Sequence, residues 1–436
     1  MKTATFIFGI AAIASASQCD AQSMFRGDAA HSGVYAGKGP REFHRVKWSF
    51  PTGARIVSSP VTQDGVIFFG SDDGNVYAVN AGSGQQIWRH TTGGPVAATP
   101  AVSGGVVYIG SYDSKFYALD ARTGAPKWKF VTGGERRFEA KGIHGWQPKT
   151  QTIPDPFDMY LSSPVVANGT VYFGSGDGNL YALDANSGDL RWKFTAGDVV
   201  HASPAYVDGV VYVGSWDSWF YAVDAASGKE KWRFHGGEDP LIHNQVGFQS
   251  SPAVFNGVVY TGCRDSNVYA IDAATGKEKW HFNNNGSWAI ASPAVTQGKV
   301  FFATSDSALY HVVDALTGKA VLQQEGKAYM FSSPAIAGDV VLIGVGNGTL
   351  EARDLASGKL LWDFQTEASK QNAGWVLTAD RKFNNSLLFR SGAQWQEPTI
   401  DATNRMLRVG SIFSSPLVAG GTVYFGSNDG NLYAIE

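Results

Sequence analysis

The sequence predicts an all-β fold: an eight-bladed β-propeller of four-stranded antiparallel blades, whose ring is closed by the N-terminal strand. Three observations predict it. The chain has 52 glycines in 436 residues and 13% aromatic residues, a composition typical of many short strands joined by tight turns. One unit of roughly 40 residues recurs eight times, a period typical of propellers and solenoids. The two ends of the chain carry complementary parts of one unit.

Each unit begins with a small residue followed by proline. Successive prolines lie 40, 64, 40, 48, 41, 41 and 82 residues apart, and we interpret the last interval as one unit with a long insertion. The eight prolines are Pro60, Pro100, Pro164, Pro204, Pro252, Pro293, Pro334 and Pro416.

Within a unit, three β signals precede a fourth that contains tryptophan. The clearest apolar run, Val210 to Val213, is typical of a strand buried on both faces, and glycine or Asp-Gly pairs mark the turns. Four strands in every unit indicate blades. The last unit stops at Glu436, before its tryptophan strand, whereas Trp48 lies in a strand without a preceding unit. We therefore expect these two segments to share one sheet and close the ring.

The first residues resemble a secretory signal. Met1-Lys2, an apolar run from Ala4 to Ala14 and small residues at 15–17 predict a signal peptide over residues 1–21 and a single propeller domain over 22–436. The expected location is therefore the periplasm or the exterior. Lipid attachment at Cys19, which would make an outer-membrane lipoprotein, is less favoured because Ser17-Gln18 precedes it. Without Cys19 only Cys263 remains, so no intramolecular disulfide is expected.

Charge and hydropathy exclude two classes of partner. The net charge of −3 does not provide the basic surface that nucleic-acid binding requires. No segment reaches the roughly 20 apolar residues of a transmembrane helix. We expect a monomer.

The tryptophan strands carry a family resemblance. Ala182-x-Asp184-x-x-x-Gly188-x-x-x-Trp192, and its repeats, resemble the tryptophan-docking motif of eight-bladed propellers of the pyrroloquinoline-quinone type. The resemblance covers nearly all of residues 44–436. It implies that one tryptophan wedges between each pair of neighbouring blades; the candidates are Trp48, Trp88, Trp128, Trp192, Trp232, Trp280 and Trp362. The sixth copy departs from the motif because Leu322 replaces its tryptophan.

Unusual sequence gathers in links from a fourth strand to the next blade. The insertions at 135–161 and 365–412, and the loop from His235 to Gln249, are all such links. Neighbouring strands of an antiparallel blade run in opposite directions, so every fourth strand ends at the same face of the propeller. The three links therefore surround one mouth of the central channel. Long loops without periodicity are usually functional or disordered.

Residues that occur in only one copy are the candidates for a partner- or ligand-binding face. Arginine and tryptophan on loops are typical interface anchors. Two interpretations remain open for the insertions: they bind a partner, or they pack on each other and bury their aromatic residues. His201 and Gln249 would form a polar spot in the channel wall or a satisfied structural pair. The candidates are Arg136, Arg137, His144, Trp146, His201, Trp216, His243, Gln249, Arg264, Trp288, Lys370, Trp375 and Arg390.

No catalytic or metal-binding motif is present, so no catalytic residue and no metal ligand is assigned. Two classes compete within the family that the chain resembles. Exported propellers similar to BamB are non-catalytic and bind other envelope proteins in outer-membrane protein assembly. Quinoprotein oxidoreductases hold pyrroloquinoline quinone, with calcium nearby, between a tryptophan and a disulfide of adjacent cysteines, which this sequence lacks. We therefore expect a protein-binding scaffold without a cofactor, whose partner is an envelope protein or a small polar ligand. The quinone-dependent dehydrogenase is the alternative.

Overall fold

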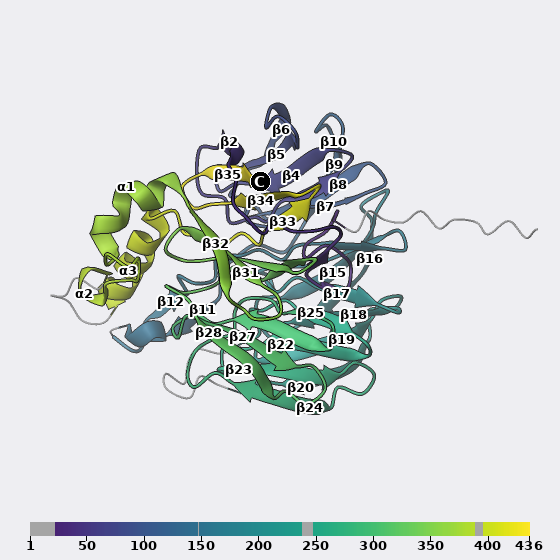
Figure 1. Cartoon of the computed structure of the whole chain (residues 1–436). Helices are drawn as coiled ribbons and strands as arrows, with labels where there is room; N and C mark the ends of the chain where they lie inside the picture. Colours follow the sequence, from purple (N-terminus) through teal and green to yellow (C-terminus); the bar gives the residue numbers. More distant parts are fainter. Residues whose placement is uncertain (1–21, 147, 238–246, 389–395) are drawn as a thin grey trace, which may run out of the picture.

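The computed structural model describes residues 22–146, 148–237, 247–388 and 396–436. Eight four-stranded antiparallel sheets surround a central axis as the blades of a propeller (Figure 1), which confirms the predicted fold. Blade 1 begins with β3, and the blades follow in chain order to blade 8.

Within each blade, the four strands lie side by side in order from the central axis outward. The innermost strands are β3 (Val61–Gln63), β7 (Ala101–Ser103), β13 (Val165–Ala167), β17 (Ala205–Val207), β21 (Ala253–Phe255), β25 (Ala294–Thr296), β29 (Ala335–Ala337) and β33 (Leu417–Ala419). The second strands are β4 (Val66–Gly70), β8 (Val106–Ser111), β14 (Thr170–Gly174), β18 (Val210–Gly214), β22 (Val258–Gly262), β26 (Lys299–Ala303), β30 (Val340–Gly344) and β34 (Thr422–Gly426).

The third strands are β5 (Asn75–Asn80), β9 (Lys115–Asp120), β15 (Asn179–Asp184), β19 (Trp219–Asp224), β23 (Asn267–Asp272), β27 (Leu309–Asp314), β31 (Thr349–Asp354) and β35 (Asn431–Ile435). The outermost strands are β6 (Gln86–Thr91), β10 (Pro126–Val131), β16 (Leu190–Thr195), β20 (Glu230–His235), β24 (Glu278–Asn283), β28 (Ala320–Glu325), β32 (Leu360–Gln365) and β2 (Val46–Pro51).

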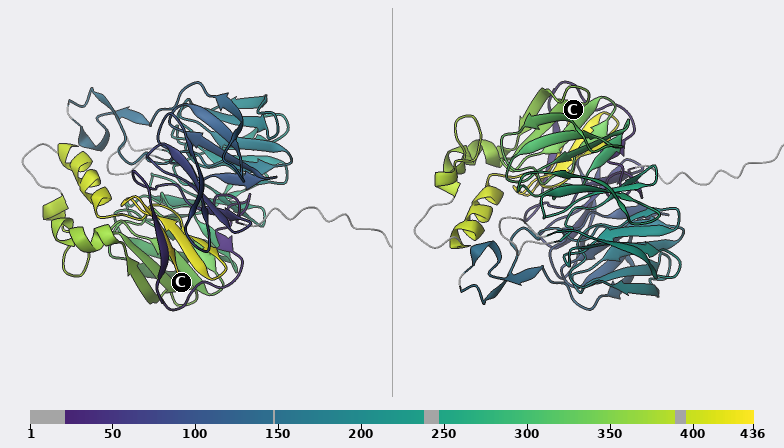
Figure 2. Two further views of the ribbon diagram at one scale, coloured as in Figure 1. Left: turned by 90° about the horizontal axis from the view of Figure 1, so that it is seen from above. Right: turned by 90° about the horizontal axis from the view of Figure 1, so that it is seen from below.

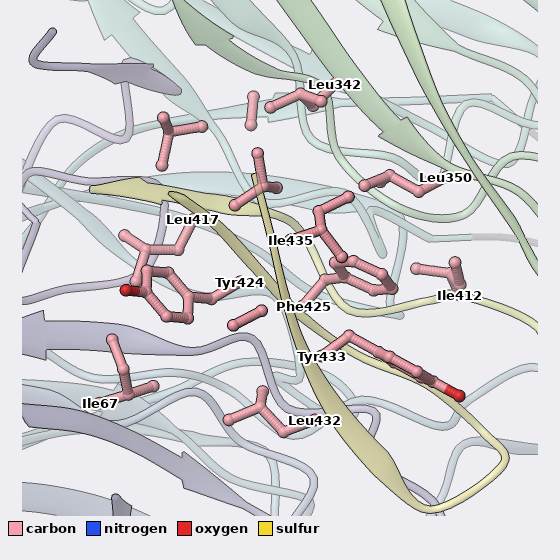
Figure 3. Packing of buried hydrophobic residues seen from close by; sticks show 14 of the residues in the cluster. Ile67, Leu342, Leu350, Ile412, Leu417, Tyr424, Phe425, Leu432, Tyr433 and Ile435 are labelled. Carbon is pink, nitrogen blue, oxygen red and sulfur yellow. The ribbon is translucent and has the colours of Figure 1, made fainter. Parts of the chain in front are cut away.

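The hydrophobic pattern explains this order. Second strands such as β14 and β18 are buried at every position, because a neighbouring blade covers each face. Outermost strands such as β20 alternate between buried and exposed residues, because one face meets solvent. Figure 3 shows the resulting core across blades 7, 8 and 1, where Leu342, Tyr424 and Ile67 belong to one apolar cluster.

The N-terminal strand closes the ring as predicted. β2 pairs antiparallel with β35, with Trp48 opposite Ala434 and Phe50 opposite Leu432, so both ends of the chain contribute to blade 8. Because the N-terminal strand completes the sheet of the last blade, the ring of blades is closed.

Tryptophans of the outermost strands lie between neighbouring blades. The Trp232 Nε1–H donates to Ala273 O at 3.0 Å, and the indole lies so close to Gly276 that an added Cβ would stand 2.7 Å from it. Gly276 has φ 72°, so two constraints require glycine here. The same bond joins Trp48 to Ala81, Trp88 to Ala121, Trp128 to Ala185, Trp192 to Ala225, Trp280 to Ala315 and Trp362 to Pro40.

The junction between blades 6 and 7 uses another arrangement. Leu322 packs over Gly358 in place of an indole, and the Arg353 guanidinium donates to the carbonyls of Gly358 and Glu325 and to the Glu351 carboxylate. Arg353 and Gly358 both belong to blade 7, so the bond from Arg353 that crosses this junction is the one to Glu325 O of blade 6.

Residues 22–35, which we call the N-terminal plug, fill the mouth of the channel away from the insertions. Backbone N–H groups of six innermost strands donate to its carbonyl oxygens, and β1 (Val34–Tyr35) pairs parallel with β29. The buried Arg26 guanidinium donates to Pro334 O and Pro293 O. The sequence had indicated no role for this segment beyond its place in the domain.

The two insertions contain their own elements: β11 (Glu139–Lys141), the 3₁₀ helix η1 (Ile143–Gly145) and β12 (Thr152–Pro154) in the first, and α1 (Glu367–Val376), α2 (Asn385–Leu388) and α3 (Gln396–Arg408) in the second. Among the described residues, no helix is both long and apolar enough to cross a membrane.

Candidate functional site

The two insertions lie side by side over one mouth of the channel, and we call them together the lid. Both views in Figure 2 place α1–α3 beside the β11–β12 hairpin at the same end of the propeller, and α3 contacts η1. Strand parity had indicated this arrangement, since both insertions follow an outermost strand.

An apolar cluster joins the lid to the channel wall. It combines buried side chains of both insertions with side chains at the mouth, so the insertions pack on each other and on the propeller. Its members include Met159, Val376, Leu377, Leu388, Met406 and Leu407 from the lid and Trp288, Ile290, Phe331 and Phe413 from the wall. The lid is therefore an integral part of the folded domain, attached through its own core.

Two buried ionic clusters fix the first insertion to the blades, and His201 is the centre of one. Its Nε2 lies 2.7 Å from Glu135 Oε1, and its Nδ1 lies 2.8 Å from Asp158 Oδ1. The side chains of His201, Glu135 and Asp158 are 1%, 7% and 0% exposed. The second carboxylate oxygen of Asp158 accepts the Phe138 N–H at 2.7 Å, which holds the insertion's backbone in place.

Arg264 is the centre of the other cluster. Its Nη1 donates to Asp155 Oδ2 at 2.5 Å and its Nε to Gln249 Oε1 at 3.0 Å. The guanidinium lies between the rings of Trp216 and Trp288, 4.3 and 4.4 Å from their centroids. His144 Nε2 lies 3.1 Å from the other oxygen of Asp155, and Gln249 Nε2 donates to Phe157 O at 2.7 Å.

Burial and charge together set the protonation of both clusters. Burial disfavours the His201 imidazolium, but Asp158 and Glu135 outweigh it and raise the pKa of His201 to about 10. Burial would raise the pKa of the Asp155 carboxyl, but Arg264 and His144 hold it well below its usual range. His201 is therefore a cation and Asp155 an anion near neutral pH, and each faces an opposite charge.

Below the lid, eight hydroxyls form a ring around the channel. The residue before each repeat proline is serine or threonine, and its backbone N–H donates to the hydroxyl of the next blade at 2.9 to 3.2 Å. The bonds run from Ser59 through Thr99, Ser163, Ser203, Ser251, Ser292, Ser333 and Ser415 back to Ser59. This cyclic chain ties the innermost ends of all eight blades together.

The hydroxyl ring surrounds a cavity of about 40 Å³, which lies between Phe25 of the plug and Tyr160 of the lid. His201 and Gln249 line it together with six apolar residues at the equivalent position in other blades. A volume of about 300–1,000 Å³ is typical of a pocket for a drug-sized ligand, so this cavity has room only for a few water molecules. Both polar side chains of this wall, His201 and Gln249, are bonded to the lid.

The structure places the sequence-derived candidates in two groups. His201, Trp216, Gln249, Arg264 and Trp288 are buried under the lid, and His144 bonds to Asp155 there. The other described candidates lie toward the outside: Arg136 pairs with Asp198, Arg137 lies over Tyr112, Trp146 bonds to Gln151, Lys370 pairs with Glu367, and Trp375 is 52% exposed. His243 and Arg390 lie outside the described residues.

Sequence reasoning missed the carboxylates Glu135, Asp155 and Asp158, the stacking residue Phe138 and the hydroxyl ring. The ring had a signal, because a hydroxyl residue precedes every repeat proline. The carboxylates had none, since His201 and Arg264, the blade residues that they pair with, are separated from them in sequence by 43 residues or more.

The described residues at this mouth do not fit a metal ion or a quinone. No group of three or more histidine, cysteine or carboxylate side chains in the described ranges could hold a metal, and a doubly hydrogen-bonded imidazolium such as His201 has no lone pair for one. The two faces of Trp216 are covered: Phe138 stacks on its ring at 4.6 Å, and Arg264 lies over it at 4.3 Å. A planar cofactor would have to displace both side chains.

A ring of blades wedged by tryptophans, with a plug at one mouth and a lid at the other, defines an eight-bladed propeller of the pyrroloquinoline-quinone-like class. The chain belongs to the family described as outer membrane protein assembly factor BamB, whose model matches residues 41–140, 136–283 and 264–436. The BamB protein of Shewanella oneidensis is 27% identical over 167 residues, which are 35% of this chain and 42% of that relative. The match therefore spans less than half of the relative's length.

Solved structures share the fold. BamB from Moraxella catarrhalis aligns with a TM-score of 0.63 and 15% identity over 90% of this chain and 97% of that one. A europium-containing methanol dehydrogenase aligns with a TM-score of 0.69 and 14% identity over 96% and 98%. The quinohemoprotein alcohol dehydrogenase from Comamonas testosteroni gives 0.67 and 15% over 97% and 81%. Such identities show a common fold and leave the function to the site.

Proposed function

We propose that this protein is a non-catalytic, protein-binding scaffold of the bacterial envelope that serves outer-membrane protein assembly, in the periplasm or at the outer membrane. The observation that carries the proposal is the family match, which extends over nearly the whole propeller. The family is described by its part in outer-membrane protein assembly, and an extended surface on a rigid frame suits a protein that holds other proteins.

The geometry of the channel supports a surface function. The cavity of about 40 Å³ lies between the plug and the lid, whereas an active site for an organic substrate needs roughly ten times that volume. Buried ionic clusters fix the first insertion to the blades, and an apolar cluster packs both insertions against the channel mouth. Binding would therefore take place on the outside of the molecule.

The test uses the full-length chain in its own cells. We expect cross-linking in the intact envelope to join it to components of the outer-membrane assembly machinery, and we expect its deletion to lower the level of outer-membrane β-barrel proteins. Fractionation should recover it with the periplasm or the outer membrane. Recovery in the cytoplasm, or unchanged barrel-protein levels together with no cross-linked assembly component, would refute the proposal.

The alternative, a quinone-dependent dehydrogenase, has a direct test. Purified protein mixed with pyrroloquinoline quinone and calcium should retain no quinone absorbance after gel filtration and should reduce no dye with alcohols or sugars, because side chains fill the space beside Trp216. Stoichiometric quinone retention would overturn the scaffold proposal.

A further inference from the structure

The lid has a charge unlike that of the rest of the chain. Residues 135–161 and 365–412 together contain ten lysine and arginine residues and eight aspartate and glutamate residues, whereas the remaining sequence contains 25 and 30. A basic segment therefore lies on an acidic body.

The buried clusters increase this difference at the surface. Glu135, Asp155 and Asp158 are three of the eight acidic residues of the lid, and all three are buried against His201 and Arg264, which the blades contribute. The blades thus neutralise lid carboxylates from below. The rest of the lid keeps ten basic residues against five acidic ones in its sequence. Two of the ten, Arg136 and Arg381, pair with Asp198 and Asp363 outside the lid, and the other eight still outnumber the five acidic residues.

Several of these basic side chains are exposed, among them Lys141, Lys149, Lys382 and Arg408. Trp375 on α1 is 52% exposed, more than any other tryptophan in the described part of the chain. An exposed tryptophan in a segment rich in basic residues has the composition of a binding hot spot.

We propose that the outer face of the lid is a docking surface for an acidic segment of another envelope protein, with Trp375 as its apolar anchor. The inference rests on the proposed function and names the surface and the chemistry of the partner. Charge complementarity selects the partner, because a positive face attracts a negative one and repels basic surfaces.

A protein fits this face better than a membrane does. An interfacial helix needs a broad apolar face to enter the lipid, but Val376 of α1 and Ala402, Met406 and Leu407 of α3 are already buried in the cluster beneath the lid. Trp375 is the one large apolar side chain on the described part of the lid that is more than one-third exposed.

The experiment places a photo-cross-linking amino acid in the full-length protein in cells, either at Gln371, one helical turn before Trp375, or at Ala226, an exposed turn residue of blade 4 on the opposite face. We expect adducts at position 371 whose cross-linked peptides carry net negative charge, and few adducts at position 226. Trp375→Ala should lower the yield at position 371 tenfold or more.

Charge reversal provides a matched pair of variants. Lys149→Glu, Lys382→Glu and Arg408→Glu combined should lower the yield tenfold or more. Lys229→Glu, Lys277→Glu and Lys319→Glu, in exposed turns of the opposite face, change the net charge equally and should keep the yield within twofold. Melting curves of both variants confirm that each is folded.

The outcomes separate the possibilities. Equal losses from the two reversals, or adducts on neutral or basic peptides, would refute the acidic partner. Adducts at position 226 alone would leave the scaffold function intact and refute this surface, whereas adducts at neither position would count against both. Co-sedimentation with phosphatidylglycerol vesicles that only the lid reversal abolishes, without any protein adduct at position 371, would identify a membrane as the occupant and refute the inference.

Discussion

Replacing His201 by glutamine should destabilise the protein by several kcal/mol, because it leaves two buried carboxylates facing an uncharged amide. A pKa of about 10, against 6.5 for the ordinary side chain, corresponds to about 4 kcal/mol at pH 7. Breaking a buried ion pair by removing one partner costs about 3–5 kcal/mol. The two routes agree on a loss near 4 kcal/mol.

The pH dependence has a definite sign. Because the pKa of His201 is raised in the folded state, its contribution is fully present below the unfolded pKa of 6.5 and is lost as the pH rises through about 10. The difference in unfolding free energy between the wild type and His201→Gln should therefore shrink between pH 7 and pH 10. Urea unfolding followed by tryptophan fluorescence at several pH values measures it.

His281→Gln is the matched control. His281 Nδ1 also lies 2.8 Å from a carboxylate, that of Glu278, but its side chain is 53% exposed. Exposed ion pairs contribute about 0–1 kcal/mol, so this variant should unfold almost as the wild type does. The reasoning would be refuted if His201→Gln cost no more than His281→Gln, or if its cost stayed constant up to pH 10.

Three further predictions concern the lid and the blades. Arg264→Leu should cost about 3–5 kcal/mol, and adding Asp155→Asn should restore much of it, because the lost stability comes from an uncompensated buried carboxylate; additive losses in urea unfolding would contradict this. Replacing residues 370–408 by a short Gly/Ser linker should lower the melting temperature and induce binding of the dye ANS, since the apolar mouth beneath becomes exposed; an unchanged melting curve would show that the lid is not integral. Trp232→Ala should cost about 3–5 kcal/mol in urea unfolding, whereas the exposed Trp375→Ala should stay within about 0.5 kcal/mol; similar losses would argue against blade wedging.

The fold was predictable because its information is local and repeated. Eight prolines, spaced 40–48 residues apart except across the two insertions, specify eight units, and the missing tryptophan strand after Glu436 matches the extra one at Trp48. Each blade needs the same turn, the same buried run and the same wedge, so one departure, such as Leu322, is visible against seven regular copies. Both insertions follow the fourth strand of a blade, so the sequence also indicated that they lie at one mouth.

The candidate site was predictable only in part. Three residues stood out because other copies lack them: Arg264, Trp216 and His201. Their burial was not apparent, because composition alone cannot distinguish an interface arginine from one that is buried between two indole rings. The carboxylates that pair with them lie in an insertion without periodicity. Nothing in residues 22–35 indicated that they follow the innermost strands around the second mouth.

By itself, the sequence of this protein determined the number of blades, the shared eighth sheet and the residues that make its lid unlike the repeats. These are consequences of spacing along the chain. Only the tertiary structure decided which charges face solvent: Asp155 and Asp158 reach Arg264 and His201 across 109 and 43 residues of sequence. The physical reason is that desolvation forces buried charges to find partners in space, and this pairing beneath the lid leaves its basic residues in excess on the surface.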